Sequence, residues 1–249
     1  MSDEKTAAKL ESLIRGEDGI LAAGKEGLIV VDCSTSDPVS TGQLASDLAA
    51  AGMHLVDAPL SRTPKEAEAG TLDTMVGADD AMFEEVRPVL ECWATIIVRV
   101  GPVGSGHTMK LINNFIGMGY AAIYSEALAV GMRAGITPDV FHSVIGAGRM
   151  RNGFYDTFMK WVIERDEDAH RFSIANAHKD MRYLANLAAA SGSANFIGNI
   201  VKNYLATAEA QGKGEDYVPM LSDHVAALNG VSLTGGAPAS GPVRKVDES

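Results

Sequence analysis

The stretch GPVGSGHTMKLINNF, residues 101–115, separates two parts of the chain whose hydrophobic residues recur with different periods. Before it, short β-branched or apolar runs such as GLIVVDCST and ATIIVRVG alternate with helical stretches such as PVSTGQLASDLAAAG. This alternation is typical of α/β proteins with a mostly parallel sheet. After it, apolar residues recur at helical spacing and the strand signals end. The sequence therefore predicts an α/β fold in which a sheet domain is followed by an all-α domain.

The predicted domain boundaries follow from these two periods. We expect a sheet domain over residues 1–104, a helical domain over residues 105–233 and a disordered tail over residues 234–249, which are rich in Gly, Pro, Ser and charge. A long helix that begins near Ser105 should form the spine of the helical domain. The stretch from 101 to 115 would then lie at a domain junction, where ligand sites commonly occur.

Composition excludes several classes of protein. At 249 residues and 46% hydrophobic content, the chain can bury a sizeable core. A formal charge of −11 without a basic cluster argues against nucleic acid as a partner. The two cysteines and six histidines form no ligand-like spacing, so we expect no structural metal and a reducing cytoplasmic location. No segment resembles a signal peptide or approaches the roughly 20 apolar residues that span a bilayer, so we expect no membrane association.

The glycines of the opening stretch allow two interpretations. Gly101 and Gly106 bracket four residues and Thr108 follows, so the stretch nearly matches the phosphate-binding loop G-x-x-x-x-G-K-[ST]. His107, however, occupies the position of the lysine that contacts the terminal phosphates of a nucleotide. We therefore favour the second interpretation, in which the glycines deliver the chain from a strand into a helix.

The helix that follows carries a polar face. Lys110, Asn113, Asn114 and Gly117 fall at i, i+3, i+4 and i+7, so they share one side of an otherwise apolar helix. A lysine at a domain junction can be partly desolvated, which lowers its pKa and lets it exchange a proton near neutral pH. Asn114 can hydrogen-bond that amine or a substrate hydroxyl, and Gly117 leaves room for a ligand. The alternative is a solvated lysine beside two helix-capping amides.

Two further motifs contain candidate binding residues. In DAPLSRTPKEAEAGTLDTMVGA, a strand ends in a polar turn formed by Ser61, Arg62 and Thr63. The arginine offers a planar fork that suits a carboxylate or sulfonate, although a surface pair with Glu66 or Glu68 is an equally good interpretation.

The other motif is HKDMRYLANLAAASG, in which Lys179 and Asp180 stand at the predicted start of a helix. The aspartate complements the helix dipole there, which is an ordinary structural role. The lysine is disfavoured in the first turn, which points weakly to a ligand. His178 is assigned a packing or capping role.

Together the three motifs resemble the β-hydroxyacid dehydrogenase family, which includes 3-hydroxyisobutyrate dehydrogenase and tartronate semialdehyde reductase, over residues from about 10 to 230. The family's catalytic signature G-x-G-x-x-x-K-x-x-N-N is matched by Gly104, Gly106, Lys110, Asn113 and Asn114. Its substrate signature is echoed by DAPLSRTPKEAEAGTLDTMVG, and its cofactor signature, which opens with Lys-Asp, is matched from Lys179. The segment GLIVVDCSTSDP resembles the family's fifth sheet strand and the turn after it.

The resemblance implies a function and a role for each site residue. The implied reaction is hydride transfer between NAD or NADP and a small 3-hydroxy acid or its semialdehyde, without a metal. Lys110 would act as general acid/base and Asn114 would orient it, while Asn113 and the turn at Ser61 would bind the acid group of the substrate. The cofactor would be bound by Ser34, Thr35, Lys179 and Asp180. The family also implies a homodimer or homotetramer formed through the helical half.

The chain departs from the family pattern at its substrate turn. Most members have Ser-Gly-Gly where this chain has Ser61-Arg62-Thr63. The Arg-Thr pair resembles the sulfolactaldehyde reductase branch, and an arginine there would favour a strongly anionic head group such as a sulfonate. In that branch, however, we would expect Gly in place of Ser61 and Ser in place of Gly117. The substrate class is therefore a small anion, either a carboxylate or a sulfonate.

A second departure concerns the cofactor domain. No G-x-G-x-x-G turn occurs in the 249 residues, although such a turn seats the cofactor pyrophosphate in Rossmann-type domains. Relative to the family, we expect that about sixty residues, two βαβ units of roughly thirty each, are absent from this sequence. The fold is therefore expected to be an incomplete Rossmann-type sheet domain followed by the helical domain.

Three explanations remain open at this point: the translation start lies upstream, the chain is a fragment, or it has lost cofactor binding. In the third case the chain would be a non-catalytic association or ligand-binding module. The sequence leaves open the choice between NAD and NADP, since the residue that reads the ribose 2′ position would lie in the missing part.

Overall fold

The computed structural model describes residues 5–234, which belong to two compact units. The first unit comprises Met1–Ile116 together with His178–Lys202, and the second comprises Gly117–Ala177 together with Asn203–Ser249. The boundary expected at residue 104 stays a prediction. The predicted tail from residue 235 onward lies outside the described residues.

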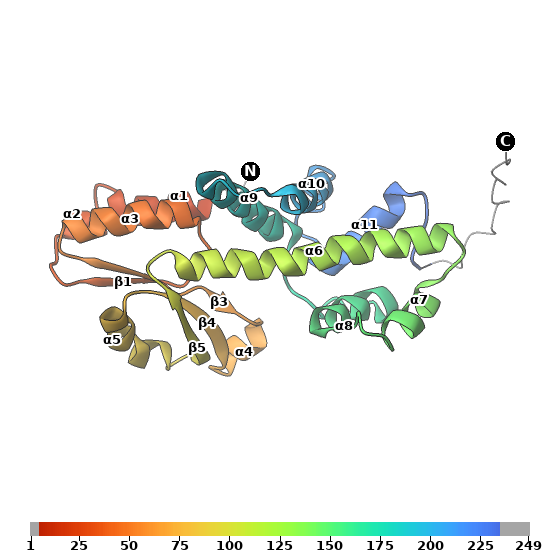
Figure 1. Cartoon of the computed structure of the whole chain (residues 1–249), viewed down its shortest axis with the longest axis horizontal. Coiled ribbons are helices and arrows are strands. Elements are labelled where there is room, and N and C mark those ends of the chain that lie inside the picture. The colour runs from red at the N-terminus through yellow and green to blue at the C-terminus, as the bar shows by residue number, and fades with distance from the viewer. Residues whose placement is uncertain (1–4, 235–249) are drawn as a thin grey trace. The chain divides into compact units, whose positions relative to one another are not determined.

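The first unit contains the sheet, whose strands lie where the short apolar runs predicted them (Figure 1). The strands are β1 (Ile29–Asp32), β2 (His54–Asp57), β3 (Leu60–Ser61), β4 (Leu72–Gly77) and β5 (Ala94–Gly101). The α/β class expected from the alternation of runs and helical stretches is confirmed. The helices of this unit are α1 (Lys5–Arg15), α2 (Ile20–Ala23), α3 (Pro38–Ala50), α4 (Pro64–Glu68) and α5 (Asp80–Leu90), with parts of α6, α9 and α10.

The pairing of the strands is more mixed than the expected, mostly parallel, arrangement. β1 pairs with β2 and β4 pairs with β5 in parallel, but β2 and β3 both run antiparallel to β4. The partners Asp57–Gly77, Leu60–Thr74 and Ser61–Asp73 keep one register, so β2 and β3 form one extended segment along β4. The connection after Ser61 is short and contains only the five-residue helix α4, whereas a parallel crossover needs a dozen or more residues.

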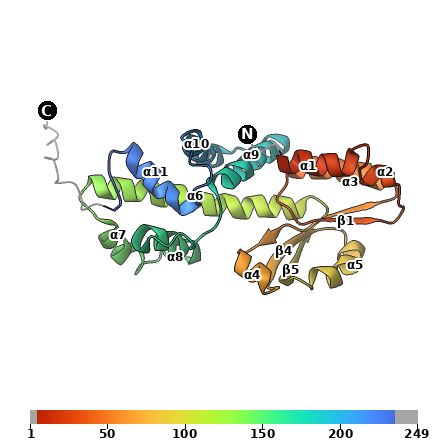
Figure 2. The same cartoon turned by 180° about the vertical axis from the view of Figure 1, so that it is seen from behind.

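Helices cover both faces of this sheet because alternate strand residues point to opposite sides. Leu55 packs with Leu44 and Leu48 of α3 and with Ile14 of α1. The next residue, Val56, belongs to a separate core cluster with residues of α5. Figures 1 and 2 show α1 and α3 beside each other on one face of the sheet and α5 on the other.

The long helix α6 (Ser105–Arg133, 29 residues) begins at the predicted position. Its amino end touches β2, where the carboxylate of Asp57 accepts hydrogen bonds from the backbone amides of Gly104 (2.7 Å) and His107 (2.8 Å). Gly104 has φ +91°, a conformation that favours glycine. At Gly106 a Cβ would lie 2.4 Å from the carbonyl oxygen of Met75. The glycines therefore serve the turn and the close approach of helix to sheet, and the amides a phosphate would need are already bonded to Asp57.

The second unit is helical over its described residues, apart from one isolated bridge between Ser173 and Tyr217. It holds the carboxyl-terminal part of α6, and a cluster of aromatic rings packs on that helix through Tyr120 and Tyr124. Its other elements are α7 (Pro138–Ile145), α8 (Gly153–Met159), the π-helical turn η1 (Lys160–Glu164), parts of α9 (Ile174–Ser191) and α10 (Phe196–Ala210), the 3₁₀ turn η2 (Val218–Met220) and α11 (Leu221–Leu228).

The length and apolar composition of helix α6 are relevant to the expectation that the protein has no membrane association. Among residues 5–234 it is the one helix that is long and apolar enough to cross a bilayer, judged by length and composition. No run of this kind was expected from the sequence. Of its most apolar window, 44% is buried inside the protein, and core helices of soluble proteins meet the same criterion.

We predict that Gly106→Ala destabilises the protein by about 3 kcal/mol or more, because the added methyl group would overlap two backbone carbonyl oxygens. Urea unfolding followed by circular dichroism measures the change. Gly119→Ala on the same helix is the control, since no atom lies within 4 Å of a Cβ built there. The control should be neutral or stabilising by up to about 1 kcal/mol. Equal effects of the two substitutions would contradict this account of Gly106.

Candidate active site

Lys110 projects from the second turn of α6 toward the end of β3. Its Nζ donates a hydrogen bond to the Ser61 hydroxyl at 3.1 Å. Burial lowers the pKa of Lys110, the nearby Asp180 carboxyl raises it, and the Lys179 ammonium lowers it. Burial is the largest of these effects. The solvated lysine considered from the sequence is therefore not what the structure shows.

Asn114 lies one turn further along α6 and contacts α9. Its amide Nδ2 donates to Asp180 Oδ2 at 2.7 Å, while its Oδ1 lies 3.5 Å from the Asn113 amide nitrogen. Asp180 is 1% exposed. Burial raises the pKa of Asp180, and the Lys179 charge, the Asn114 hydrogen bond and the Lys110 charge each lower it. Asn113 itself is exposed.

Lys179 links Asp180 to the turn after β1. Its Nζ is 3.4 Å from Asp180 Oδ1 and donates to the backbone carbonyl oxygen of Thr35 at 3.3 Å. The ammonium also lies 5.7 Å from the centre of the Tyr183 ring, and the side chain is 9% exposed. Lys179 and Asp180 stand in the second turn of α9, which begins at Ile174, so the expectation that they open a helix is displaced by one turn.

The turn after β1 contains buried hydroxyl groups. The Oγ atoms of Ser34 and Ser36 are inaccessible to solvent and have no hydrogen-bond partner among residues 5–234. The turn is shaped by Asp32, whose Oδ1 accepts from the backbone amide of Ser34 at 2.9 Å. Buried hydroxyls without partners are costly, so these two atoms are suited to a polar ligand at the carboxyl end of β1.

The turn at Ser61 differs from the expectation that Ser61, Arg62 and Thr63 all face a substrate. Arg62 Nε pairs with Asp73 Oδ2 at 2.7 Å, rather than with Glu66 or Glu68. Arg62 has φ +86°, the left-handed region that favours glycine. The amide and hydroxyl of Thr63 both donate to the Glu66 carboxylate, which forms the capping box of α4. Ser61 alone of the three contacts Lys110.

Gly117 lies one turn beyond Asn113 and Asn114 on α6. A Cβ built at Gly117 would meet the Phe154 ring at 3.4 Å, so an aromatic side chain covers the space expected for a ligand. Contacts thus join Lys110 to Ser61, and they join Asn114, Asp180, Lys179 and Thr35 in a second chain. The charge of Asp180 links the two groups through its effect on the Lys110 pKa. Thr63 and Gly117 lie outside this network.

Two buried residues of this region were not singled out as site residues from the sequence. Asp57 is fully buried at the end of β2, and His107 is fully buried in the first turn of α6. His107 Nδ1 is 2.8 Å from the Thr41 hydroxyl and its Nε2 is 3.5 Å from Asp32 Oδ2. The available signals were the charged residue that ends the apolar run HLVD and the histidine in the lysine position of the phosphate-loop pattern.

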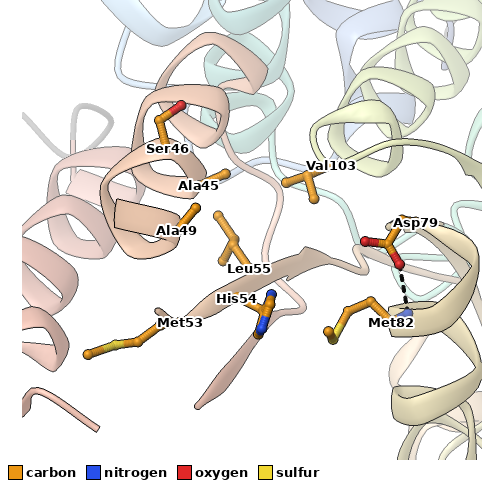
Figure 3. Close-up of a pocket in the computed structure, with 9 residues that line it drawn as sticks. All are labelled: Ala45, Ser46, Ala49, Met53, His54, Leu55, Asp79, Met82 and Val103. Carbon is orange, nitrogen blue, oxygen red and sulfur yellow. Dashed lines mark hydrogen bonds between the residues drawn. The ribbon is translucent and has the colours of Figure 1, made fainter. Parts of the chain in front are cut away.

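The hollow drawn in Figure 3, about 290 Å³ in volume, contains none of these residues. It lies between α3, α5 and the beginning of β2, whereas Ser34 follows the end of the parallel strand β1. The two places are therefore at opposite ends of the parallel strand pair. Ligands of open α/β sheets bind at the carboxyl ends. The hollow is lined by Ala45, Ser46, Ala49, Met53, His54, Leu55, Asp79, Met82 and Val103.

Comparison with known proteins places this geometry in a family. Residues 5–101 match the NAD binding domain of 6-phosphogluconate dehydrogenase. Residues 104–224 match the NAD-binding domain of NADP-dependent 3-hydroxyisobutyrate dehydrogenase. The chain is 33% identical to 2-(hydroxymethyl)glutarate dehydrogenase of Eubacterium barkeri over 92% of its own length and 76% of that protein. The chain belongs to the β-hydroxyacid dehydrogenase family.

Two further relatives place the chain within this family. It is 26% identical to 3-sulfolactaldehyde reductase of Escherichia coli K12, over 92% of its length and 75% of that protein. The crystal structure of 3-hydroxyisobutyrate dehydrogenase from Salmonella typhimurium aligns with a TM-score of 0.72 and 25% identity, over 87% of this chain and 75% of that one. The chain thus spans about three quarters of these β-hydroxyacid dehydrogenases.

Membership of the β-hydroxyacid dehydrogenase family confirms three expectations from the sequence. The fold is of the Rossmann-type sheet and helical-domain kind, the chemical class is oxidoreductase, and the cofactor is a nicotinamide dinucleotide.

The pKa shift of Lys110 gives a pH-dependent prediction. Because burial lowers its pKa in the folded state, the unfolded chain binds more protons between that pKa and the unfolded value of about 10.4. The stability of the native protein relative to Lys110→Met should therefore rise from pH 7 to pH 10. Urea unfolding at several pH values measures this difference. Lys213→Met, which alters an exposed lysine, is the control. The difference in unfolding free energy between the native protein and this variant should not change with pH. A falling difference for Lys110→Met would show that folding stabilises the Lys110 ammonium.

Proposed function

We propose that this chain transfers a hydride between a nicotinamide cofactor and a small 3-hydroxy acid or its semialdehyde, with Lys110 as general acid/base. The supporting observation is the placement of the Lys110 amine against the Ser61 hydroxyl, in surroundings whose burial lowers the Lys110 pKa. A lysine with a lowered pKa is available as a neutral amine nearer to physiological pH. The proposal agrees with the chemical class of the family.

In the oxidation direction, the neutral Lys110 amine takes the proton of the substrate hydroxyl while the carbon-bound hydrogen leaves as hydride. When bound, the nicotinamide ring supplies the hydride acceptor. In the reduction direction, the Lys110 ammonium returns that proton to the carbonyl oxygen. Asn114 is proposed to orient the substrate oxygen, because Asp180 fixes the direction of its amide. Asn113 and Ser61 are proposed to bind the acid group.

The residues at the carboxyl end of β1 fit the nicotinamide end of the cofactor. The unpartnered hydroxyls of Ser34 and Ser36 can hydrogen-bond a polar group there, and Lys179 holds the intervening Thr35 backbone. We propose that Ser34, Thr35 and Lys179 line this end of the cofactor site. Asp180 is proposed to act on it through its contact with Lys179.

The substrate is proposed to be a small anion that carries a carboxylate or sulfonate. The exposed Arg62 guanidinium makes one pair, through Nε, with Asp73. Glu66 also raises the Arg62 pKa through its charge, but Asp73 is the one ion-pair partner of Arg62 among residues 5–234, so its terminal nitrogens can receive an acid group. The capping box of α4 occupies the Thr63 amide and hydroxyl, so Arg62 is a better candidate than Thr63 for this contact.

Lys110→Ala should lower kcat by about a hundredfold or more, because removal of a general acid/base typically costs that much. The assay follows NADH and NADPH absorbance with 3-hydroxyisobutyrate and with 3-sulfolactaldehyde as probes. Lys213→Ala, at an exposed position, is the matched control and should retain the native rate. Equal turnover in Lys110→Ala and the native protein would refute the role of Lys110.

Binding is measured separately by titration of the 249-residue chain with NADH and NADPH. Micromolar affinity supports the proposal. Absence of binding would favour the alternative of a non-catalytic association module.

We further propose that the chain is a cytoplasmic homodimer or homotetramer formed through α6. Met109, Ile116, Ile123 and Val130 recur every seven residues along this helix, and each is exposed by at least 38%. A seven-residue apolar repeat is the pattern by which helices pair in coiled coils. The two free cysteines, Cys33 and Cys92, accord with a reducing location.

Ile123→Asp should therefore shift the protein from an oligomer toward a monomer, because a carboxylate would be desolvated in the helix pair. Size-exclusion chromatography with light scattering measures the mass. Val144→Asp, at an equally exposed apolar residue of α7 outside the repeat, is the control and should leave the mass unchanged. A native protein that is already monomeric would remove this proposal.

A further inference from the structure

We propose that Asp57 is a positioning residue, which clamps the first turn of α6 to β2 so that Lys110 meets Ser61. The inference rests on the proposed role of Lys110 and assigns a function to a residue outside the network already described. It concerns the geometry of the amine, and it can be tested without substrate or cofactor.

The clamp uses both oxygens of the Asp57 carboxylate. Oδ1 accepts from the Gly104 amide at 2.7 Å and Oδ2 accepts from the His107 amide at 2.8 Å. These amides belong to the start of a helix, where the first N–H groups have no partner within the helix. The helix dipole also favours a negative charge at that point. Asp57 is fully buried, so water does not compete for either hydrogen bond.

Two glycines leave the space that the clamp occupies. A Cβ at Gly77, the partner of Asp57 on β4, would lie 2.2 Å from Asp57 Oδ1. A Cβ at Gly106 would lie 2.6 Å from the Asp57 carbonyl oxygen and 2.9 Å from Oδ2. The carboxylate is therefore enclosed by β4 on one side and by α6 on the other. If the start of the helix shifted along the strand, the Asp57 carboxylate would no longer fit in the space that Gly77 and Gly106 leave open.

The same strand and the same helix meet a second time at the proposed catalytic residue. Ser61 follows Asp57 by four positions on the extended β2–β3 segment, and Lys110 follows His107 by three positions on α6. The hydrogen bond from Lys110 Nζ to Ser61 Oγ is this second meeting point. Because a strand and a helix are both stiff over one turn, fixing one point determines where the other falls. Asp57 thus controls the distance between the Lys110 amine and Ser61.

His107 extends the clamp to the end of β1. Its backbone amide is bonded to Asp57, while its ring lies between the Thr41 hydroxyl, at 2.8 Å, and Asp32 Oδ2, at 3.5 Å. Asp32 in turn binds the amide of Ser34. The first turn of α6 is therefore bonded to β2 through Asp57 and to α3 through Thr41, and its His107 ring lies beside the end of β1.

The test measures the titration of the Lys110 amine by competitive acetylation at a series of pH values, read by mass spectrometry of the Lys110 peptide. Only the neutral amine reacts, so the midpoint of labelling reports the Lys110 pKa. In Asp57→Asn one acceptor oxygen is replaced by an amide group that repels a backbone N–H. We expect the Lys110 midpoint to rise by about one pH unit toward an ordinary lysine, as the amine leaves its buried position.

The matched control is Asp79→Asn, which removes the charge of another helix-capping carboxylate in the same unit. Asp79 accepts from the Met82 amide at 2.8 Å at the start of α5. Because Asp79 is exposed and asparagine also caps helices well, this variant should lose little stability, and it should leave the Lys110 midpoint unchanged. A purely structural role for Asp57 predicts that Asp57→Asn loses stability but gives the same Lys110 midpoint as Asp79→Asn and the native protein. That result would overturn the proposal.

Asp57→Ser also keeps one acceptor oxygen but places no fixed N–H donor against a backbone amide, so it should give a smaller shift in the same direction. If Asp57→Asn unfolds in buffer, all proteins are measured in trimethylamine N-oxide, which stabilises folded states, after circular dichroism shows the native spectrum. A folded Asp57→Asn with the native midpoint contradicts the proposal under either condition. Because labelling needs no turnover, its outcome is separate from that of the activity assay, which tests the proposed function itself.

Discussion

The bond between the buried Asp57 carboxylate and the first amides of α6 is the constraint on which the arrangement of the site depends. Two backbone amides and one carboxylate are removed from water together, and each would cost about 1–3 kcal/mol if left without its partner. The helix can therefore start in one place only. The side chains on its first three turns, including those proposed for the site from His107 to Asn114, take their positions along the sheet from that start.

The second determinant is the balance between burial and charge around Lys110 and Asp180. Burial disfavours the charged form of each, so it lowers the pKa of the lysine and raises the pKa of the aspartate. Their mutual attraction acts in the opposite sense on both groups. Asn114, one turn beyond Lys110 on α6, donates a hydrogen bond to the aspartate. A proton-transfer residue in a family of nicotinamide-dependent dehydrogenases benefits from this balance, because it needs both states within reach near neutral pH.

Most helices and strands could be predicted from the sequence, but several of the polar contacts between side chains could not. The apolar runs predicted β1, β2, β4 and β5, and the glycine-rich stretch predicted the start of α6 near Ser105, because these signals depend on residues close together in the chain. The short strand β3 lies where a turn at Ser61 was expected. The antiparallel pairing of β3 with β4, the pairing of Arg62 with Asp73 and the capping role of Thr63 were not predicted. Asp57 escaped notice because an aspartate at the end of a strand has the same local pattern whether it faces solvent or a helix.

By itself, the sequence determined the α/β class, the three motifs and the family to which they belong. These are properties of periodicity and spacing along one chain, so they do not depend on the exact distances between atoms. Only the tertiary structure decided which donors are already bonded and which remain available: Arg62 is half engaged, Thr63 is fully engaged, and Asn114 reaches Asp180 across 66 positions of sequence. A hydrogen bond requires partners within about 3 Å, and packing between distant segments is what sets that distance.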